Sequence, residues 1–236
     1  MTTILETSSM NIILSQITAP SAGVSIQVDL VPGMIQAFIL GIVQGITEFL
    51  PISSTAHLLI FTKVFGWKEL GSKDFVDAIQ FGSVIAILCY FWSVISSLVK
   101  GAIKAFKNKD WESEDWKIVV GIAAGTIPAL TIGFVLKDVI PESALIIAIM
   151  SLIMAILLGL AEKLGNRKRG FNALEIRDGI LVGLGQTLAL VPGVSRSGST
   201  LTTGLFLGLK REAAAKFSFL LGFPTLTIAT LYKSLK

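Results

Sequence analysis

The stretch Pro192-Gly193-Val194-Ser195-Arg196-Ser197-Gly198-Ser199-Thr200 decides how this chain can fold, because it interrupts the apolar segment 179–209. A charged side chain at membrane depth is costly and needs a partner or a function. Irregular backbone at that depth is tolerated only where protein buries it or where it lines a watery cavity. We therefore expect a re-entrant helical hairpin that turns near residues 192–197, followed by a helix from about Ser199 to Leu209. The alternative is a kinked full span that contains polar residues.

A second interruption lies in the apolar segment 31–66, in the stretch Gln44-Gly-Ile-Thr-Glu48-Phe-Leu-Pro51-Ile-Ser53-Ser54-Thr-Ala-His57. Gln44 and Glu48 are four positions apart, so they share one helix face. Pro51 ends that helix, and Ser53 or Ser54 suits the N-cap of a following helix that runs to about Phe65. This pattern predicts a matching hairpin that turns near residues 51–54, again with a kinked span as the alternative.

The composition indicates a membrane protein. Of 236 residues, 53% are hydrophobic and only 15% are charged, against about 25% charged in soluble domains. One cysteine, Cys89, and one histidine, His57, exclude a disulfide framework within the chain and clusters of several histidines. The net charge of +4 comes from loop residues that set topology, so no nucleic-acid partner is expected. The expected fold class is an all-α polytopic membrane protein.

Four other apolar stretches are each close to the roughly 20 residues that a span needs. They cover residues 78–99, 118–136, 144–160 and 217–232. Lysine and arginine concentrate in the loops 100–117 and 162–178, which we expect to be cytoplasmic. The segments 67–76 and 137–143 then lie outside, and the two hairpins enter from opposite faces.

The two interrupted segments resemble each other at an offset of 142 positions, with Gln44 matching Gln186 and Ser53 matching Ser195. Three spans separate the hairpins, and an odd number inverts the second copy. Inverted repeats with broken helices can build one site from both halves. We expect a single membrane domain at 31–236, with repeat one at about 31–99 and repeat two at about 179–236. Residues 1–30 are an N-terminal extension of unknown role.

The polar residues at the two turns suit a phosphate site. Helix N-termini favour anions, and the guanidinium of Arg196 is a planar fork that matches phosphate oxygens. A simpler interpretation is that Glu48 and Arg196 only pair and hold the halves together. His57 would then be a structural histidine, and the hydroxyls would be ordinary interhelical hydrogen-bonding groups.

Both turns resemble signatures of the undecaprenyl-diphosphate phosphatase family, the bacitracin-resistance type: residues 44–58 the first and 192–200 the second. The resemblance implies hydrolysis of undecaprenyl diphosphate to undecaprenyl phosphate and inorganic phosphate, which recycles the lipid carrier for peptidoglycan synthesis. It also implies a divalent cation, usually Mg²⁺, and a site opening toward the outer face of the bacterial cytoplasmic (inner) membrane. The partners expected are the polyprenyl diphosphate and the bilayer, and a homo-oligomer stays open. Family chains continue beyond the region matching 217–232, so a truncated sequence is expected.

The resemblance also assigns roles to residues. The expected catalytic residues are Glu48, Ser54, His57 and Arg196. The expected phosphate-binding residues are Ser53, Thr55, Ser195, Arg196, Ser197 and Thr200. Glu48 would also bind the metal, and Gln44, where some members carry Glu, would support the site.

Two mechanisms stay open. In the first, Ser54 is a nucleophile activated by His57 or Glu48. In the second, water attacks directly with Glu48 as the base, while Ser53 and Ser54 bind phosphate. A different function is a transporter or flippase of a lipid phosphate, because inverted repeats with broken helices also build transporters.

Overall fold

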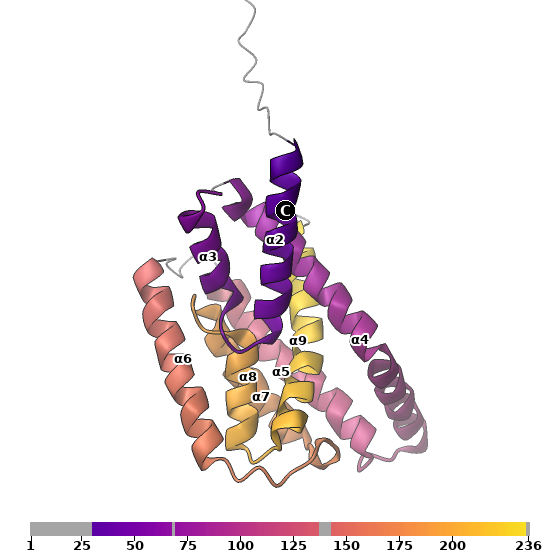
Figure 1. Ribbon diagram of the computed structural model, residues 1–236. Helices are drawn as coiled ribbons and strands as arrows, with labels where there is room; N and C mark the ends of the chain where they lie inside the picture. Colours follow the sequence, from indigo (N-terminus) through magenta and orange to yellow (C-terminus); the bar gives the residue numbers. More distant parts are fainter. Residues whose placement is uncertain (1–29, 68, 137–142, 235–236) are drawn as a thin grey trace, which may run out of the picture. The chain divides into compact units, whose positions relative to one another are not determined.

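The computed structural model describes residues 30–67, 69–136 and 143–234, and these form helices joined by short loops (Figure 1). The α-helices are α2 (Leu30–Phe49), α3 (Ser54–Val64), α4 (Lys73–Asn108), α5 (Glu114–Leu136), α6 (Ala144–Leu164), α7 (Ile176–Thr187), α8 (Arg196–Phe206) and α9 (Arg211–Ser234). Short 3₁₀ turns are η1 (Glu69–Gly71), η2 (Phe171–Ala173) and η3 (Leu188–Leu190). The described residues contain no β-strand, which confirms the all-α prediction.

The chain divides into two compact units, residues 1–35 and 36–236. Of the first unit, the structure describes only the beginning of α2. The expected extension 1–30 therefore lies outside the described residues except for Leu30, as do positions 137–142 of the expected external segment.

Among the described residues of this unit, four helices are long and apolar enough to cross a membrane, namely α4, α5, α6 and α9. They contain the four predicted stretches. The α9 helix begins at Arg211, six residues before the predicted start, because its first turn is polar and an apolar window cannot detect it. The α5 helix continues through Pro128, so this proline does not end it.

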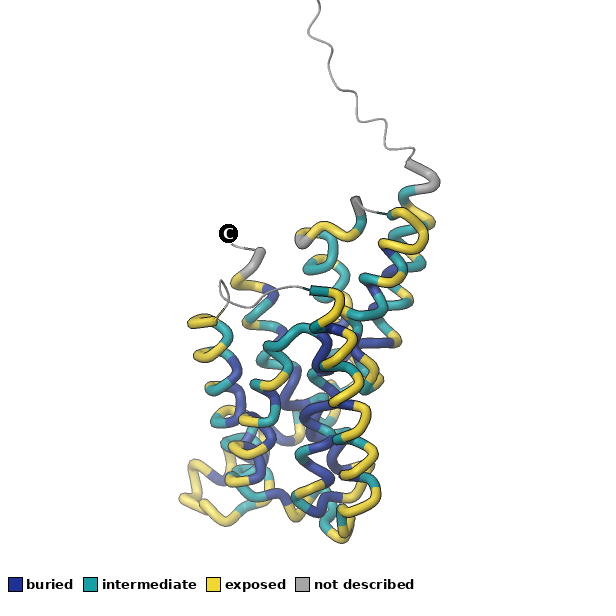
Figure 2. The backbone as a smooth tube through the Cα atoms, turned by 90° about the vertical axis from the view of Figure 1, so that its left-hand side faces the viewer, coloured by how far each residue is buried: buried dark blue, intermediate teal, exposed yellow. Residues whose placement is uncertain are grey.

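Apolar side chains cover the outside of these helices. In α6 only one stripe is buried (Ile147, Met154 and Ala161), while Leu145 and Leu152 are 68% and 63% exposed. Figure 2 shows the same division: buried residues lie along the inner sides of the helices and exposed residues along their outer sides. A surface this apolar suits contact with lipid chains.

Glycines bring α5 and α7 into backbone contact. A Cβ on Gly179 would lie 2.4 Å from the Cα of Gly121, and a Cβ on Gly183 would lie 2.4 Å from the Cα of Gly125. Small residues allow this close packing of membrane helices. The contact fixes α7, which leads directly into the second polar turn.

Candidate functional site

The first tip, residues 48–54, joins the end of α2 to the start of α3. The α2 helix ends at Phe49, two residues before Pro51, and α3 begins at Ser54. Ser53 is the N-cap, and its hydroxyl accepts a hydrogen bond from the backbone N–H of Ala56 at 3.4 Å. Its φ of 65° is unusual for a residue other than glycine, and such strain tends to persist where the surroundings hold it in place.

The second tip, residues 191–197, joins η3 to α8. We expected the helix here to start at about Ser199, and this was wrong by three residues. Ser195 caps it instead, accepting a hydrogen bond from the backbone N–H of Gly198 at 3.1 Å, so α8 begins at Arg196. Ser199 and Thr200 therefore lie inside the helix. Like α3, α8 has 11 residues and a serine N-cap, at the predicted offset of 142.

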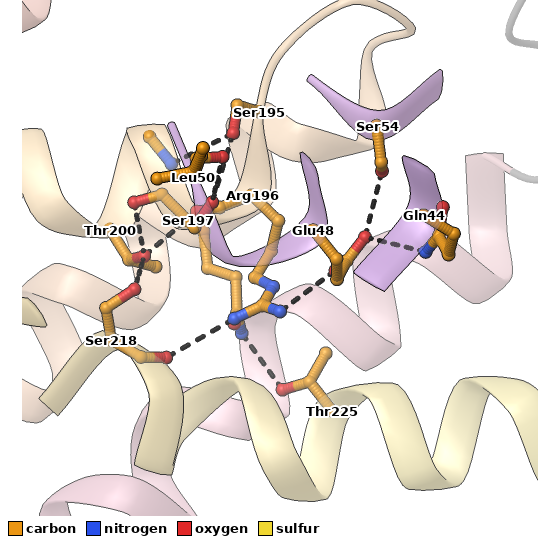
Figure 3. A network of polar contacts seen from close by, with 12 residues as sticks. Gln44, Glu48, Leu50, Ser54, Ser195, Arg196, Ser197, Thr200, Ser218 and Thr225 are labelled. Atoms are coloured by element: carbon orange, nitrogen blue, oxygen red, sulfur yellow. Dashed lines mark hydrogen bonds and ion pairs between the residues drawn. The ribbon is translucent and has the colours of Figure 1, made fainter. Parts of the chain in front are cut away.

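The two tips touch each other, as predicted (Figure 3). The Nη2 atom of Arg196 lies 2.9 Å from Oε1 of Glu48, which is 148 positions away in the chain. The hydroxyl of Ser197 donates to the backbone carbonyl of Leu50 at 3.1 Å. An ion pair and a side-chain-to-backbone hydrogen bond thus join the tips.

The Glu48 carboxylate is the centre of the polar network, and Glu48 is only 6% exposed. Besides Arg196, it accepts from the Gln44 amide at 3.1 Å and from the Ser54 hydroxyl at 2.9 Å, both on Oε2. The predicted shared face of Gln44 and Glu48 is confirmed. The amide oxygen of Gln44 is buried without a hydrogen-bond partner among the described residues.

The Arg196 guanidinium rests on α9. Its Nη1 donates to the backbone carbonyl of Ser218 at 3.4 Å. A Cβ on Gly222 would lie 2.0 Å from the same nitrogen, so only glycine leaves room for the guanidinium here. The Nε atom is buried and has no partner in the part of the chain that the structure describes. The arginine therefore keeps one donor free.

A cavity of about 660 Å³ opens beside this network. Its polar lining consists of Thr47, Glu48, Ser53, Ser54, Thr55, Gln80, Gln186, Ser195, Arg196 and Thr225. Its apolar lining comes from α5, η3, Val194 and α9 and includes Leu130, Phe134, Leu190, Leu226 and Ile228. A site with charged groups on one part of its wall and apolar side chains on the rest suits an amphiphilic ligand.

Four predicted residues are not among the residues that line the cavity: Gln44, His57, Ser197 and Thr200. The Nδ1 atom of His57 lies 2.9 Å from the backbone carbonyl of Ser53, which ties the ring to its own helix. Thr200 bonds to the carbonyl of Arg196 at 2.9 Å and to the Ser218 hydroxyl. Within the structure, His57 and Thr200 therefore support the tips.

Four polar residues of the cavity were not predicted as site residues: Thr47, Gln80, Gln186 and Thr225. Gln186 was noted only as the match to Gln44 in the repeat. A buried glutamine inside an apolar segment was a usable signal. Thr225 carried none, because threonines in membrane helices commonly bond to their own backbone.

The few metal-ligating side chains of this site suit a metal ion that is bound mainly by substrate phosphates. Among the described residues, no group of three or more His, Cys, Asp or Glu side chains could bind a metal ion. Among the described residues that line the cavity, Glu48 is the one carboxylate. Mg²⁺ commonly binds through one or two carboxylates together with substrate phosphates, and Glu48 fits that pattern.

Comparison with known proteins identifies the family. Residues 37–236 match the family model described as bacitracin resistance protein BacA. The chain is 57% identical over 202 residues to a protein of Thermosynechococcus vestitus named undecaprenyl-diphosphatase, covering 85% of this chain and 74% of that protein. Proteins of the same name from Trichormus variabilis and a Synechocystis species are 51% and 49% identical over 84% of this chain. The chain spans 64% and 63% of the length of these two relatives. Because this family model matches most of its length, the chain belongs to the bacitracin resistance protein BacA family.

Proposed function

We propose that this chain is a membrane phosphatase that hydrolyses undecaprenyl diphosphate to undecaprenyl phosphate and inorganic phosphate. The observation that carries the proposal is the buried Glu48–Arg196 pair, which joins two capped helix starts beside a cavity with polar and apolar walls. The names of the relatives agree with it. The product is the lipid carrier for peptidoglycan synthesis, so the activity would support cell shape and bacitracin resistance.

The diphosphate would bind where the two tips meet. Arg196 offers Nε, which no described residue occupies, so a phosphate oxygen can bind the guanidinium without displacing Glu48. The free N–H groups at the starts of α3 and α8 add favourable dipoles. Glu48 meanwhile stays neutralised by Arg196, which matters because an unpaired buried carboxylate is strongly destabilising.

In the proposed mechanism Ser54 is the nucleophile. Its hydroxyl already donates to Glu48 at 2.9 Å, so the carboxylate can take the proton as Oγ attacks the terminal phosphorus. The bridging P–O bond breaks, undecaprenyl phosphate leaves with the electron pair, and water then hydrolyses the phosphoserine. In the alternative, water attacks directly with Glu48 as base. Either way the contacts favour Glu48 over His57 as the base, because His57 faces the carbonyl of Ser53.

Mg²⁺ is the proposed cofactor. Glu48 would hold it together with diphosphate oxygens, and Gln44 would support the Glu48 carboxylate through its amide hydrogen bond. When bound, it would offset the negative charge that develops during phosphoryl transfer.

We also propose that the two tips belong to re-entrant hairpins of an inverted repeat in the bacterial inner membrane. At about 1.5 Å per residue, an 11-residue helix is about 16 Å long, whereas the hydrocarbon core is about 30 Å thick. Helices α3 and α8 are therefore too short to span. With the basic loops 100–117 and 162–178 in the cytoplasm, the site would open toward the outer face.

The test is phosphate release from undecaprenyl diphosphate by the purified chain in detergent, with and without a chelator. Hydrolysis that the chelator abolishes and Mg²⁺ restores supports both the reaction and the cation. No release by wild-type protein, in the absence of any membrane gradient, would instead favour a transporter of lipid phosphates. A phosphoserine trapped in wild type and absent in Ser54→Ala identifies the nucleophile, whereas full activity in Ser54→Ala assigns the attack to water.

A further inference from the structure

Gln186 is a buried amide with an unused hydrogen-bonding atom. It lies near the end of α7 and is 2% exposed. Its Nε2 donates to the hydroxyl of Thr225 on α9 at 3.0 Å, while its Oε1 is buried without a partner among the described residues. Both residues line the cavity. A buried polar atom without a partner calls for an explanation, and a ligand in the cavity supplies one.

The amide of Gln186 can present either an acceptor or a donor at this position. Turning it by 180° keeps the bond to Thr225, because a hydroxyl can donate as well as accept. The Thr225 hydroxyl, which otherwise donates to the backbone carbonyl of Leu221 at 3.2 Å, then donates to the amide oxygen. The NH₂ group takes the unpartnered position and can donate to an anionic oxygen.

The pair lies one helical turn from the Arg196 guanidinium. On α9, Ser218 and Gly222 contact the guanidinium, and Thr225 follows Gly222 on the same face. Positions 222 and 225 are about 4.5 Å apart along the helix axis. Figure 3 shows Thr225 on the α9 side of the guanidinium. Two phosphoryl groups that share a bridging oxygen fit this spacing, with one at Arg196 and the other at Gln186 and Thr225.

The apolar lining indicates which phosphoryl group lies at the pair. It continues along α9 beyond Thr225, with Leu226 and Ala229, and along η3 beyond Gln186, with Leu190. A lipid tail on this lining would leave its own phosphate next to the pair. The terminal phosphate would then lie at Arg196, close to the Ser54 hydroxyl on Glu48.

We propose that the Gln186 amide, oriented by Thr225, binds the lipid-linked phosphate of the diphosphate, whereas Arg196 binds the terminal phosphate. This inference rests on the proposed function and divides its substrate site in two. It predicts that the pair binds the product undecaprenyl phosphate and takes no part in binding inorganic phosphate.

The test compares inhibition by the two products in Gln186→Leu and Thr225→Val. Gln186→Leu should weaken inhibition by undecaprenyl phosphate at least about tenfold, since a lost hydrogen bond to a charged group is worth that much. Thr225→Val should weaken it in the same direction, because the amide loses the hydroxyl that orients it. Inhibition by inorganic phosphate should not change. The matched control is Thr227→Val on the same helix, because its hydroxyl bonds to the backbone of Phe223 and it is not among the lining residues. Thr225→Ser should restore wild-type inhibition.

Unchanged inhibition by undecaprenyl phosphate in both variants would overturn the inference, and so would equal weakening for both products. Direct binding of undecaprenyl phosphate to the purified chain, followed by thermal shift, gives the same comparison without catalysis. If wild type hydrolyses nothing, the proposed function fails, while this binding measurement still decides for or against the pair.

Discussion

Replacing Gly222 with alanine should lower kcat/KM strongly by displacing the Arg196 guanidinium, while the chain still folds. The added Cβ would lie 2.0 Å from Nη1 of Arg196 and 2.6 Å from its Cζ. The nearest atoms thus belong to the far end of a flexible side chain, which can move, rather than to backbone. Folding therefore tolerates the methyl group, and the guanidinium has to shift.

The size of the effect follows from these distances. Ordinary contact begins at 3.4 Å, so Nη1 has to retreat by about 1.4 Å. The 2.9 Å bond to Glu48 would then be strained or lost, and a misplacement of about 1 Å can cost about 100-fold in rate. Alanine in place of glycine stabilises a helix interior by about 0.5–1 kcal/mol. We therefore expect kcat/KM to fall about 100-fold, while this gain in the helix offsets part of the cost of the weakened ion pair.

The assay is phosphate release together with thermal unfolding in the same detergent. Gly159→Ala in α6 is the matched control, since no atom lies within 4 Å of the Cβ it would add, and it should keep full activity. Wild-type kcat/KM in Gly222→Ala would refute the reasoning, because the guanidinium would then not need its place on α9.

Three further changes test the scaffold around the site. Arg169→Ala leaves the carboxylate of Asp178, which is 1% exposed, without its cation and should cost about 3–5 kcal/mol of stability. Thermal unfolding checks this, and Arg169→Met combined with Asp178→Leu should recover most of the loss. Gly183→Val drives a side chain into the backbone of α5, so size-exclusion chromatography should show little folded protein; a normal monodisperse peak would contradict the close packing. Ser197→Ala removes the hydrogen bond between the tips and should lower kcat/KM about tenfold with little change in melting temperature, whereas unchanged kinetics would mean that the ion pair alone aligns the tips.

The arginine test depends on how Arg169 is held. It donates to both carboxylate oxygens of Asp178 and to the backbone carbonyls of Ala173 and Leu207. The hydrogen bond to Asp178 is the main reason why the pKa of Arg169 is raised. The guanidinium therefore stays charged, and the contact ties the loop before α7 to the end of α8.

Much of the fold was predictable because its signals are local. The lengths of four apolar stretches identify the spans, and Pro51 ends α2 within two residues. The spacing of Gln44 and Glu48 puts them on one helix face, and their side chains do meet. The start of α8 was misplaced because Ser195 and Ser199 are both acceptable caps by residue type. Gly193 has a φ of 95° and packs against Ile147 of α6. It directs the chain so that Ser195, rather than Ser199, becomes the N-cap.

The amino-acid sequence by itself determined that this chain is a helical membrane protein with two polar interruptions, because hydropathy, proline and capping act over a few residues. Only the tertiary structure decided what surrounds Arg196. Its partner Glu48 is 148 positions away, and Gly222 and Thr225 come from a helix that sequence patterns describe only as apolar. Such neighbours depend on which helix surfaces pack together, and spacing along the chain carries no information about contacts between distant segments.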